Sequence, residues 1–295
     1  MSKLLTVGMA TYDDFDGVYF SVQALTLYHE ILKTIDYEII IIDNNPDGEH
    51  GKAVKGLVNW MNGKGRYIPY TNQTSTAVRN EIFANSHGKY TISMDCHVLF
   101  APNAIKSLLD YYNQNPECKN IIQGPMLYDD QKNYSTQFDP VWRGDMYGIW
   151  GTNTEACENG QPFEIPMMGL GAFSCETKYW PGFNRNFKGF GGEEGYIHEK
   201  FRRNGGKAMC LPSFRWMHRF GRPSGVKYPL VLEDRIWNYF VGWLEITRNP
   251  DDIMIYSIYN HFRNRIPTNR LNNILEEAKN LILREGENDA DTSTK

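Results

Sequence analysis

The 295-residue sequence lacks the features that define several classes of protein. It has only five cysteines and no C-x-x-C spacing, so neither a zinc ribbon nor a disulfide framework is indicated. It has no run of about 18 apolar residues, the length that a membrane-spanning helix needs, and its N-terminal apolar run is too short for a signal peptide. These absences predict a soluble cytoplasmic protein with reduced thiols and no transmembrane segment.

A large surplus of one charge and the standard nucleotide-binding motifs are also missing. The 31 Lys and Arg residues against 35 Asp and Glu give a net charge of -4, which argues against a polycation that coats nucleic acid. The sequence contains neither the G-x-G-x-x-G fingerprint of dinucleotide folds nor the G-x-x-x-x-G-K-[ST] phosphate loop. A nucleotide would therefore need a binding site of another kind.

What the sequence does contain is an alternation of apolar runs and helix-like segments. Short runs rich in β-branched residues at 4–10, 37–42 and 90–94 are typical of buried parallel strands, and helical spacing occurs at 19–35 and 75–86. This order predicts an α/β fold with a mostly parallel sheet flanked by helices. Because such sheets bind ligands at the carboxyl ends of their strands, we expect one crevice lined by Thr11, Tyr12, Asp13, Asp43, Asn44 and Asp95.

The remaining segments are less regular. Residues 129–161 are rich in Asn, Asp, Gly and aromatic side chains, and we interpret them either as an excursion that shapes a substrate cleft or as a plain surface loop. Apolar residues from Leu271 to Ile282 follow helical spacing and predict an amphipathic helix that packs on the core. The polar residues 285–295 predict a disordered tail.

One candidate site follows the third strand, in the sequence Met94-Asp95-Cys96-His97. A carboxylate and an imidazole two residues apart on an extended segment point to the same side, so Asp95 and His97 could bind one divalent metal ion. An Asp at the end of a strand is also common as a turn or helix-capping residue. The residues alone leave both interpretations open.

A second candidate site is the glycine-rich segment 188–196, which contains Glu193 and Glu194. Glycines let the backbone approach a ligand closely, and the dipole of a helix favours ionised carboxylates at its N-terminus. The same two carboxylates could serve only as helix caps. Here too, the residues by themselves do not decide between a functional and a structural role.

Together these segments resemble a known family. Residues 77–97 resemble the segment that leads into the Asp-x-Asp or Asp-x-His signature of GT-A glycosyltransferases, especially family 2 and the polypeptide N-acetylgalactosaminyltransferases. The later segments are similar, in order and approximate spacing, to the Gly-Gly-x-Phe, Tyr-Phe, Gly-x-Tyr-Asp, Trp-Gly-Gly-Glu-Asn and Val-Gly-His-x-Phe-Arg series of those enzymes. The resemblance covers residues 4–220 and rests on Ala77-Val78-Arg79-Asn80, Gly88-Lys89-Tyr90, Gly169-Leu170-Gly171-Ala172-Phe173-Ser174, Tyr179-Trp180, Gly182-Phe183-Asn184, Gly191-Gly192-Glu193-Glu194, Phe201-Arg202, Gly205-Gly206 and His218-Arg219-Phe220.

This resemblance implies a GT-A fold and a transferase that uses a nucleoside-diphosphate sugar, UDP-linked, together with a divalent metal ion. It implies Asp95, His97 and His218 as the metal ligands, and this ligand set suits Mn²⁺ better than Mg²⁺. It further implies that the donor is bound by Thr11, Tyr12, Asp13, Asp43, Arg79 and Asp95.

The domain organisation that follows has three parts. We expect a GT-A catalytic domain at 1–225, a helical extension at 226–284 and the tail at 285–295. Within the catalytic domain, 1–98 would be the nucleotide-binding half and 99–225 the acceptor and catalytic half.

One departure from the family pattern bears on stereochemistry. The retaining N-acetylgalactosaminyltransferases have Asn after the Gly-Gly-Glu, whereas this sequence has Glu194. Inverting GT-A enzymes commonly place an acidic residue there. We therefore predict inversion, with Glu194 as the general base and Glu193 as the group that holds sugar or acceptor hydroxyls.

The acceptor is the least determined part. Residues 200–235 contain nine basic and two acidic side chains, which allows a polyanionic acceptor such as hydroxymethylated DNA or a lipid-linked sugar, as well as an acceptor saccharide. Two other functions stay open: a nucleotidyltransferase that acts on a sugar phosphate, and a non-catalytic protein that binds a sugar nucleotide or a glycan.

Overall fold

The N-terminal part of the chain alternates strands and helices, as its apolar periodicity predicts. The computed structural model describes residues 3–72, 75–222 and 225–292. Every residue of the second strand is buried, which shows that the sheet is covered on both faces. The elements in this part are β1 (Lys3–Thr11), α1 (Phe15–Tyr28), the 3₁₀ helix η1 (Glu30–Lys33), β2 (Tyr37–Asp43), α2 (Glu49–Asn59), β3 (Gly65–Pro69), the 3₁₀ helix η2 (Thr76–Val78), α3 (Arg79–Ala84), β4 (Gly88–Asp95) and β5 (Val98–Phe100).

The two helices predicted in this part differ from the observed ones in their bounds. α1 begins at Phe15, four residues earlier than predicted, because the Asp14 side chain caps it by accepting a hydrogen bond from the backbone N–H of Gly17. The segment 75–86 is divided into η2 and α3, and the Ser75 hydroxyl caps η2 at the backbone N–H of Ala77.

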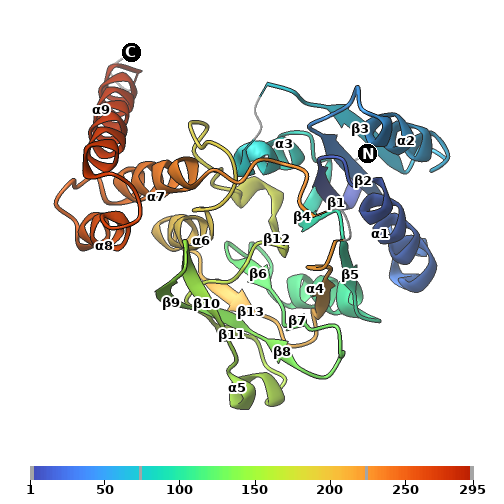
Figure 1. The fold of residues 1–295 in the computed structure, drawn as a ribbon. Helices are drawn as coiled ribbons and strands as arrows, with labels where there is room; N and C mark the ends of the chain where they lie inside the picture. The colour runs from blue at the N-terminus through green and yellow to red at the C-terminus, as the bar shows by residue number, and fades with distance from the viewer. Residues whose placement is uncertain (1–2, 73–74, 223–224, 293–295) are drawn as a thin grey trace.

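The second half of the chain completes one eight-stranded sheet, with the order β11-β13-β6-β12-β4-β1-β2-β3 (Figure 1). β1 pairs parallel with β2 and β4, β2 pairs parallel with β3, and β12 pairs antiparallel with β4 and β6. This topology confirms the predicted α/β fold. The elements of this half are α4 (Ala104–Gln114), β6 (Ile121–Gln123), β7 (Met126–Leu127), β8 (Tyr134–Ser135), β9 (Gln137–Arg143), β10 (Met146–Gly151), α5 (Thr154–Glu158), β11 (Phe163–Glu164), β12 (Ala172–Glu176), the 3₁₀ helix η3 (Thr177–Tyr179), α6 (Glu194–Arg203), β13 (Ala208–Cys210) and β14 (Trp216–His218).

The segment 129–161 is more ordered than its composition indicates. It contains β8, the antiparallel pair β9 and β10, and the short helix α5. Contacts between aromatic side chains of the pair, such as the edge-to-face packing of Phe138 and Trp150, supply the stability that the weak periodicity does not reveal.

A smaller four-stranded sheet, with the order β5-β14-β7-β8, lies beside the large one. Its strand β14 pairs antiparallel with β5, so that His218 lies opposite Val98. This pairing joins the end of the first half of the chain to a segment more than a hundred residues later.

Three helices follow: α7 (Leu232–Thr247), α8 (Ile253–Phe262) and α9 (Thr268–Thr292). They lie at the opposite end of the molecule from α1 and α2 (Figure 1). The helix predicted around residues 271–282 is longer in the structure, and it continues through Thr292 where a disordered tail was expected, because extending an existing helix needs no new nucleation. Residues 293–295 lie outside the described part of the chain. None of the described helices has the length and apolar character that crossing a membrane requires.

Gly8 lets α3 pack directly on β1. A Cβ atom at this position would lie 2.0 Å from Cγ2 of the fully buried Ile82. We expect Gly8→Ala to lower the free energy of unfolding by about 1–3 kcal/mol, because the packed core must shift to accept a methyl group. Urea denaturation measures this.

The matched control is Gly56→Ala in α2, where a new Cβ would have no atom within 4 Å. This change should instead stabilise the helix by about 0.4–1 kcal/mol. Equal effects at the two positions would show that α3 does not pack on β1 as described.

Candidate functional site

A cavity of about 320 Å³ opens at the carboxyl ends of β1 and β4. Six of the residues predicted to form the site line it: Thr11, Tyr12, Asn44, Arg79, Asp95 and His97. This is the place that a parallel sheet offers to a ligand, since the loops after the strands diverge there. Later parts of the chain line the cavity as well, with Gly189, Phe190, Tyr228, Pro229 and Asp234.

The structure brings the three predicted metal ligands together. Nε2 of His97 lies 3.1 Å from Nε2 of His218, and the latter atom lies 3.4 Å from Oδ2 of Asp95. β4 ends at Asp95 and a turn at residues 96–97 leads into β5, so the two residues do not lie on one continuous strand. The antiparallel pairing of β5 and β14 carries His218 to this turn.

The protonation of His97 follows from its two partners. Nδ1 of His97 lies 2.8 Å from Oδ2 of Asp14, and Nη2 of Arg222 lies 2.5 Å from Nε2 of His97. A carboxylate can only accept and a guanidinium can only donate, so Nδ1 carries the proton and the lone pair on Nε2 accepts the hydrogen bond from Arg222. Burial lowers the pKa of the imidazole, although the hydrogen bond with Asp14 acts in the opposite direction. The lowered pKa keeps the ring neutral at pH 7.

These side chains fit a divalent metal ion. The lone pair on Nε2 of His97 and a carboxylate oxygen of Asp95 converge on the imidazole of His218, and the ligand atoms of the three residues lie within 4.8 Å of one another. Nδ1 of His218 is buried and has no hydrogen-bond partner among the described residues. Two imidazoles and a carboxylate, one of the imidazoles held by a second carboxylate, form a donor set that suits Mn²⁺ or a similar ion.

Arg79 connects this cluster to the two glutamates. Its Nη2 donates to Oδ1 of Asp95 at 2.9 Å, and its Nη1 lies 3.7 Å from Oε1 of Glu193. Burial alone would raise the pKa of Asp95, but the charge of Arg79 and the hydrogen bond with His218 hold it well below the ordinary value. Asp95 is therefore a carboxylate at neutral pH, as a metal ligand must be.

Glu193 and Glu194 lie at the start of α6, as the sequence predicts. Glu193 occupies the N-cap position but its side chain caps no backbone N–H, and its Oε2 is buried with no hydrogen-bond partner in the described chain. Gly191 and Gly192 before it have φ angles of 97° and 91°, which favour glycine. Because a plain capping role does not account for Glu193, its burial there needs another explanation.

The carboxyl groups of Glu193 and Glu194 both have raised pKa values. Burial, followed by the charge of Glu194, raises the pKa of Glu193, and burial also raises the pKa of Glu194 against the opposing charges of Arg235 and Arg79. Neither glutamate is among the residues that line the cavity, and Glu193 contacts Arg79, which is. Raised pKa values in a carboxyl pair are a feature of groups that exchange protons in catalysis.

Two of the predicted donor-binding residues do not reach the cavity. Asp43 is buried, and its oxygens accept hydrogen bonds from the Tyr67 hydroxyl at 2.7 Å and the backbone N–H of Asn45 at 2.9 Å. Asp13 has a φ of 51° and accepts a hydrogen bond from the Asn45 side chain at 2.8 Å. In this structure both therefore hold the loop after β2, and direct contact with a ligand in the cavity would require a rearrangement.

Sequence reasoning overlooked Asp14, Arg222 and Tyr228, which all line the cavity or contact His97. The sequence pattern assigns Asp14 no place in the site, although this residue follows the first strand by three positions. The signal that could have found it is the polar end of β1, the same signal that indicated Thr11 and Tyr12. No periodicity in the sequence indicated Arg222 and Tyr228.

Comparisons with known proteins identify the family and the fold. The family model for Glycosyl transferase family 2 matches residues 6–166, more than half of the chain. A search of curated proteins gives no match.

Several solved structures share the fold. GalNAc-T7 with UDP, GalNAc and Mn²⁺ has a TM-score of 0.66 and 15% identity, over 88% of this chain and 54% of that one. The mannosyltransferase PcManGT from Pyrobaculum calidifontis with GDP-Man and Mn²⁺ has a TM-score of 0.59 and 13% identity, over 98% and 81%. TarS 1-349 of S. aureus with UDP-GlcNAc has a TM-score of 0.53 and 14% identity, over 89% and 72%. The chain thus spans about half the length of the first of these structures, and at these identities the likeness concerns the fold.

Proposed function

The chain belongs to glycosyl transferase family 2 and has the GT-A fold, and on this premise we propose that it transfers a sugar from a nucleoside-diphosphate sugar to an acceptor hydroxyl, with inversion and with a bound metal ion. The observation that carries the proposal is the convergence of Asp95, His97 and His218 beside a cavity at the carboxyl ends of β1 and β4. The Mn²⁺ complexes of GalNAc-T7 and PcManGT support Mn²⁺ as the ion, with Mg²⁺ as the alternative.

Asp95, His97 and His218 would hold this ion. When bound, it supplies Lewis-acid stabilisation of the negative charge on the departing nucleoside diphosphate. Arg222 and Arg79 place two further cationic groups at the cavity, where phosphate oxygens would accept their hydrogen bonds. Thr11 and Tyr12 line the part of the cavity next to β1 and would contact the nucleoside.

The proposed proton acceptor is Glu194, with Glu193 holding a hydroxyl of the sugar or acceptor. A base must lose its proton before it can take one from the acceptor, and the raised pKa makes Glu194 a stronger base than an exposed carboxylate. In the inverting reaction, Glu194 accepts the hydroxyl proton as the acceptor oxygen attacks the anomeric carbon and the bond to the diphosphate breaks.

For the acceptor, we propose a saccharide hydroxyl, either free or lipid-linked. The basic segment 200–235 gives less support to a polyanion such as modified DNA than its composition indicates, because most of its cations are paired within the chain. Lys200 pairs with Glu245, Arg202 and Arg203 with Glu199, Lys207 with Glu164, and Arg219 with Asp14. The location in the cytoplasm and the domain boundary at residue 225 stay predictions.

The test is hydrolysis of the donor without acceptor, measured across a panel of UDP- and GDP-sugars with Mn²⁺. We expect release of free sugar from one donor, loss of release with EDTA, and recovery when Mn²⁺ is restored. Release of pyrophosphate from a nucleoside triphosphate would indicate nucleotidyl transfer instead. Tight donor binding without turnover on any acceptor would indicate a binding protein.

A further inference from the structure

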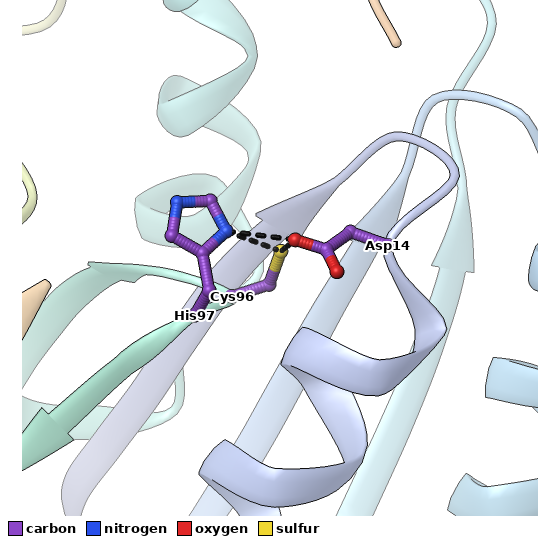
Figure 2. Close-up of side chains that lie close together, drawn as sticks. All are labelled: Asp14, Cys96 and His97. Carbon is purple, nitrogen blue, oxygen red and sulfur yellow. Dashed lines mark hydrogen bonds and ion pairs between the residues drawn. The ribbon is translucent and has the colours of Figure 1, made fainter. Parts of the chain in front are cut away.

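Asp14 is held at both oxygens of its carboxylate. Oδ1 accepts hydrogen bonds from the backbone N–H of Gly17 at 3.0 Å and from Nη2 of Arg219 at 2.8 Å. Oδ2 faces Nδ1 of His97 at 2.8 Å, and the Cys96 thiol approaches the same oxygen at 3.7 Å. Figure 2 shows His97 and Cys96 turned toward this oxygen from the turn after β4, with Asp14 at the start of α1. The carboxylate therefore cannot rotate without losing several partners.

The contacts of Asp14 also determine which ring nitrogen of His97 carries the proton. Because Gly17 and Arg219 both donate to Oδ1, the oxygen left for His97 is an acceptor, and the imidazole must keep its proton on Nδ1. The opposite nitrogen, Nε2, is then free of a proton; it accepts a hydrogen bond from Arg222 and lies beside His218 and Asp95, where a metal ion would take the place of the Arg222 donor. An imidazole whose distal N–H is bound by a carboxylate is also a stronger and better-oriented metal ligand.

We infer that Asp14 is a positioning residue that sets the tautomer and ring orientation of His97, and that Arg219 completes it by fixing the carboxylate; the inference rests on the proposed metal-dependent function. The contacts come from three separate parts of the chain: the loop after β1, the turn after β4 and the residue after β14. Arg219 is further held there by a backbone hydrogen bond from its N–H to the carbonyl oxygen of His97 at 3.2 Å.

The substitution Asp14→Asn separates this role from helix capping. Asn is as good an N-cap as Asp, so α1 should form normally. Since the donors Gly17 and Arg219 keep the amide oxygen at the Oδ1 position, the amide NH₂ group faces His97. That group needs a lone pair on Nδ1, so the imidazole proton moves to Nε2, where it blocks binding to a metal ion and replaces the hydrogen bond that Arg222 donates to this atom.

Two readouts test the inference. Long-range ¹H–¹⁵N NMR of ¹⁵N-histidine-labelled protein, with His97 assigned by a His97→Gln variant, reports which ring nitrogen carries the proton. Titration with Mn²⁺ alone and with Mn²⁺ plus UDP, followed by EPR, reports the metal affinity. We expect Nδ1–H in the wild type, Nε2–H in Asp14→Asn, and a metal affinity about 10- to 100-fold lower in the variant.

The matched control is Asp252→Asn, because Asp252 caps α8 through the backbone N–H of Met254 and does not line the cavity. It should leave the tautomer and the Mn²⁺ affinity unchanged. An Nε2–H tautomer of His97 in the wild type overturns the inference, and so does an unchanged tautomer or metal affinity in Asp14→Asn. If the variant does not fold, the wild-type spectrum still tests the inference. Failure of the wild type to bind Mn²⁺ while the tautomers behave as expected counts against the proposed function instead.

Discussion

Glu194→Gln should lower the rate of sugar transfer by about 10²- to 10⁴-fold, the range that a general base contributes. The amide keeps the size of the side chain but cannot accept the proton of the acceptor hydroxyl. Donor affinity should change little, because Glu194 does not line the cavity at β1 and β4. Steady-state kinetics with the natural donor, together with the anomeric configuration of the product by NMR, measure the effect.

The pH dependence of the wild-type rate gives an independent check. The base must be ionised, so transfer should fall as the pH decreases through the raised pKa of the glutamate pair, above the range of an exposed glutamate. Because Glu193 and Glu194 are adjacent and interact, this fall in rate at low pH reports the titration of the pair and not of one residue. In Glu194→Gln, the residual transfer rate should no longer fall in this pH range, or should fall in a different one.

A measurement of stability distinguishes loss of the general base in Glu194→Gln from loss of the folded structure. A carboxyl group with a raised folded-state pKa favours folding below its unfolded-state pKa, and this contribution is lost as the pH rises through the folded-state pKa. Ionised Glu194 therefore costs stability at alkaline pH, and Glu194→Gln should unfold at a higher urea concentration than the wild type at pH 8, with a smaller gap at pH 4.

The matched control for activity is Glu199→Gln, on the same helix but paired with Arg202 and Arg203 at the surface. It should transfer at close to the wild-type rate. A fully active Glu194→Gln, or a product with retained configuration, would contradict the assignment of Glu194 as base.

Asp95→Asn should abolish the metal-dependent reaction, with a loss of at least about 100-fold in both donor hydrolysis and transfer. An amide oxygen is a weaker ligand than a carboxylate oxygen, and loss of Lewis-acid stabilisation worth several kcal/mol corresponds to such a factor. The fold should persist, because the Asn side-chain oxygen can still accept the hydrogen bond that Arg79 donates to Oδ1 of Asp95. The measurement is the rate with Mn²⁺ varied up to saturation.

EDTA on the wild type should reproduce the effect of Asp95→Asn, and added Mn²⁺ should restore the wild type but not the variant. Asp110→Asn is the control, since Asp110 lies at the surface of α4 and pairs with Lys106. Sugar transfer that persists in EDTA, or an equal loss of transfer in Asp110→Asn, would contradict the assignment of Asp95 as a metal ligand.

The sequence by itself determined the central architecture. The buried strands at 4–10, 37–42 and 90–94 were predictable because short apolar runs rich in β-branched residues are typical of strands buried on both faces. Parallel pairing of these strands places their polar carboxyl ends at one edge of the sheet. Local spacing also located the metal candidates Asp95 and His97 and placed the two glutamates at a helix start. Each of these features depends on residues close together in the chain.

The tertiary structure alone decided which distant groups meet. His218 reaches His97 across 121 residues only because β14 pairs with β5, and Asp14 reaches His97 across 83 residues through the packing of α1. The same packing turned Asp43 inward to Tyr67 and paired most cations of the basic segment with carboxylates. Strand pairing and ion pairing over such separations are selected by the whole folded core, and no local periodicity in the sequence records them.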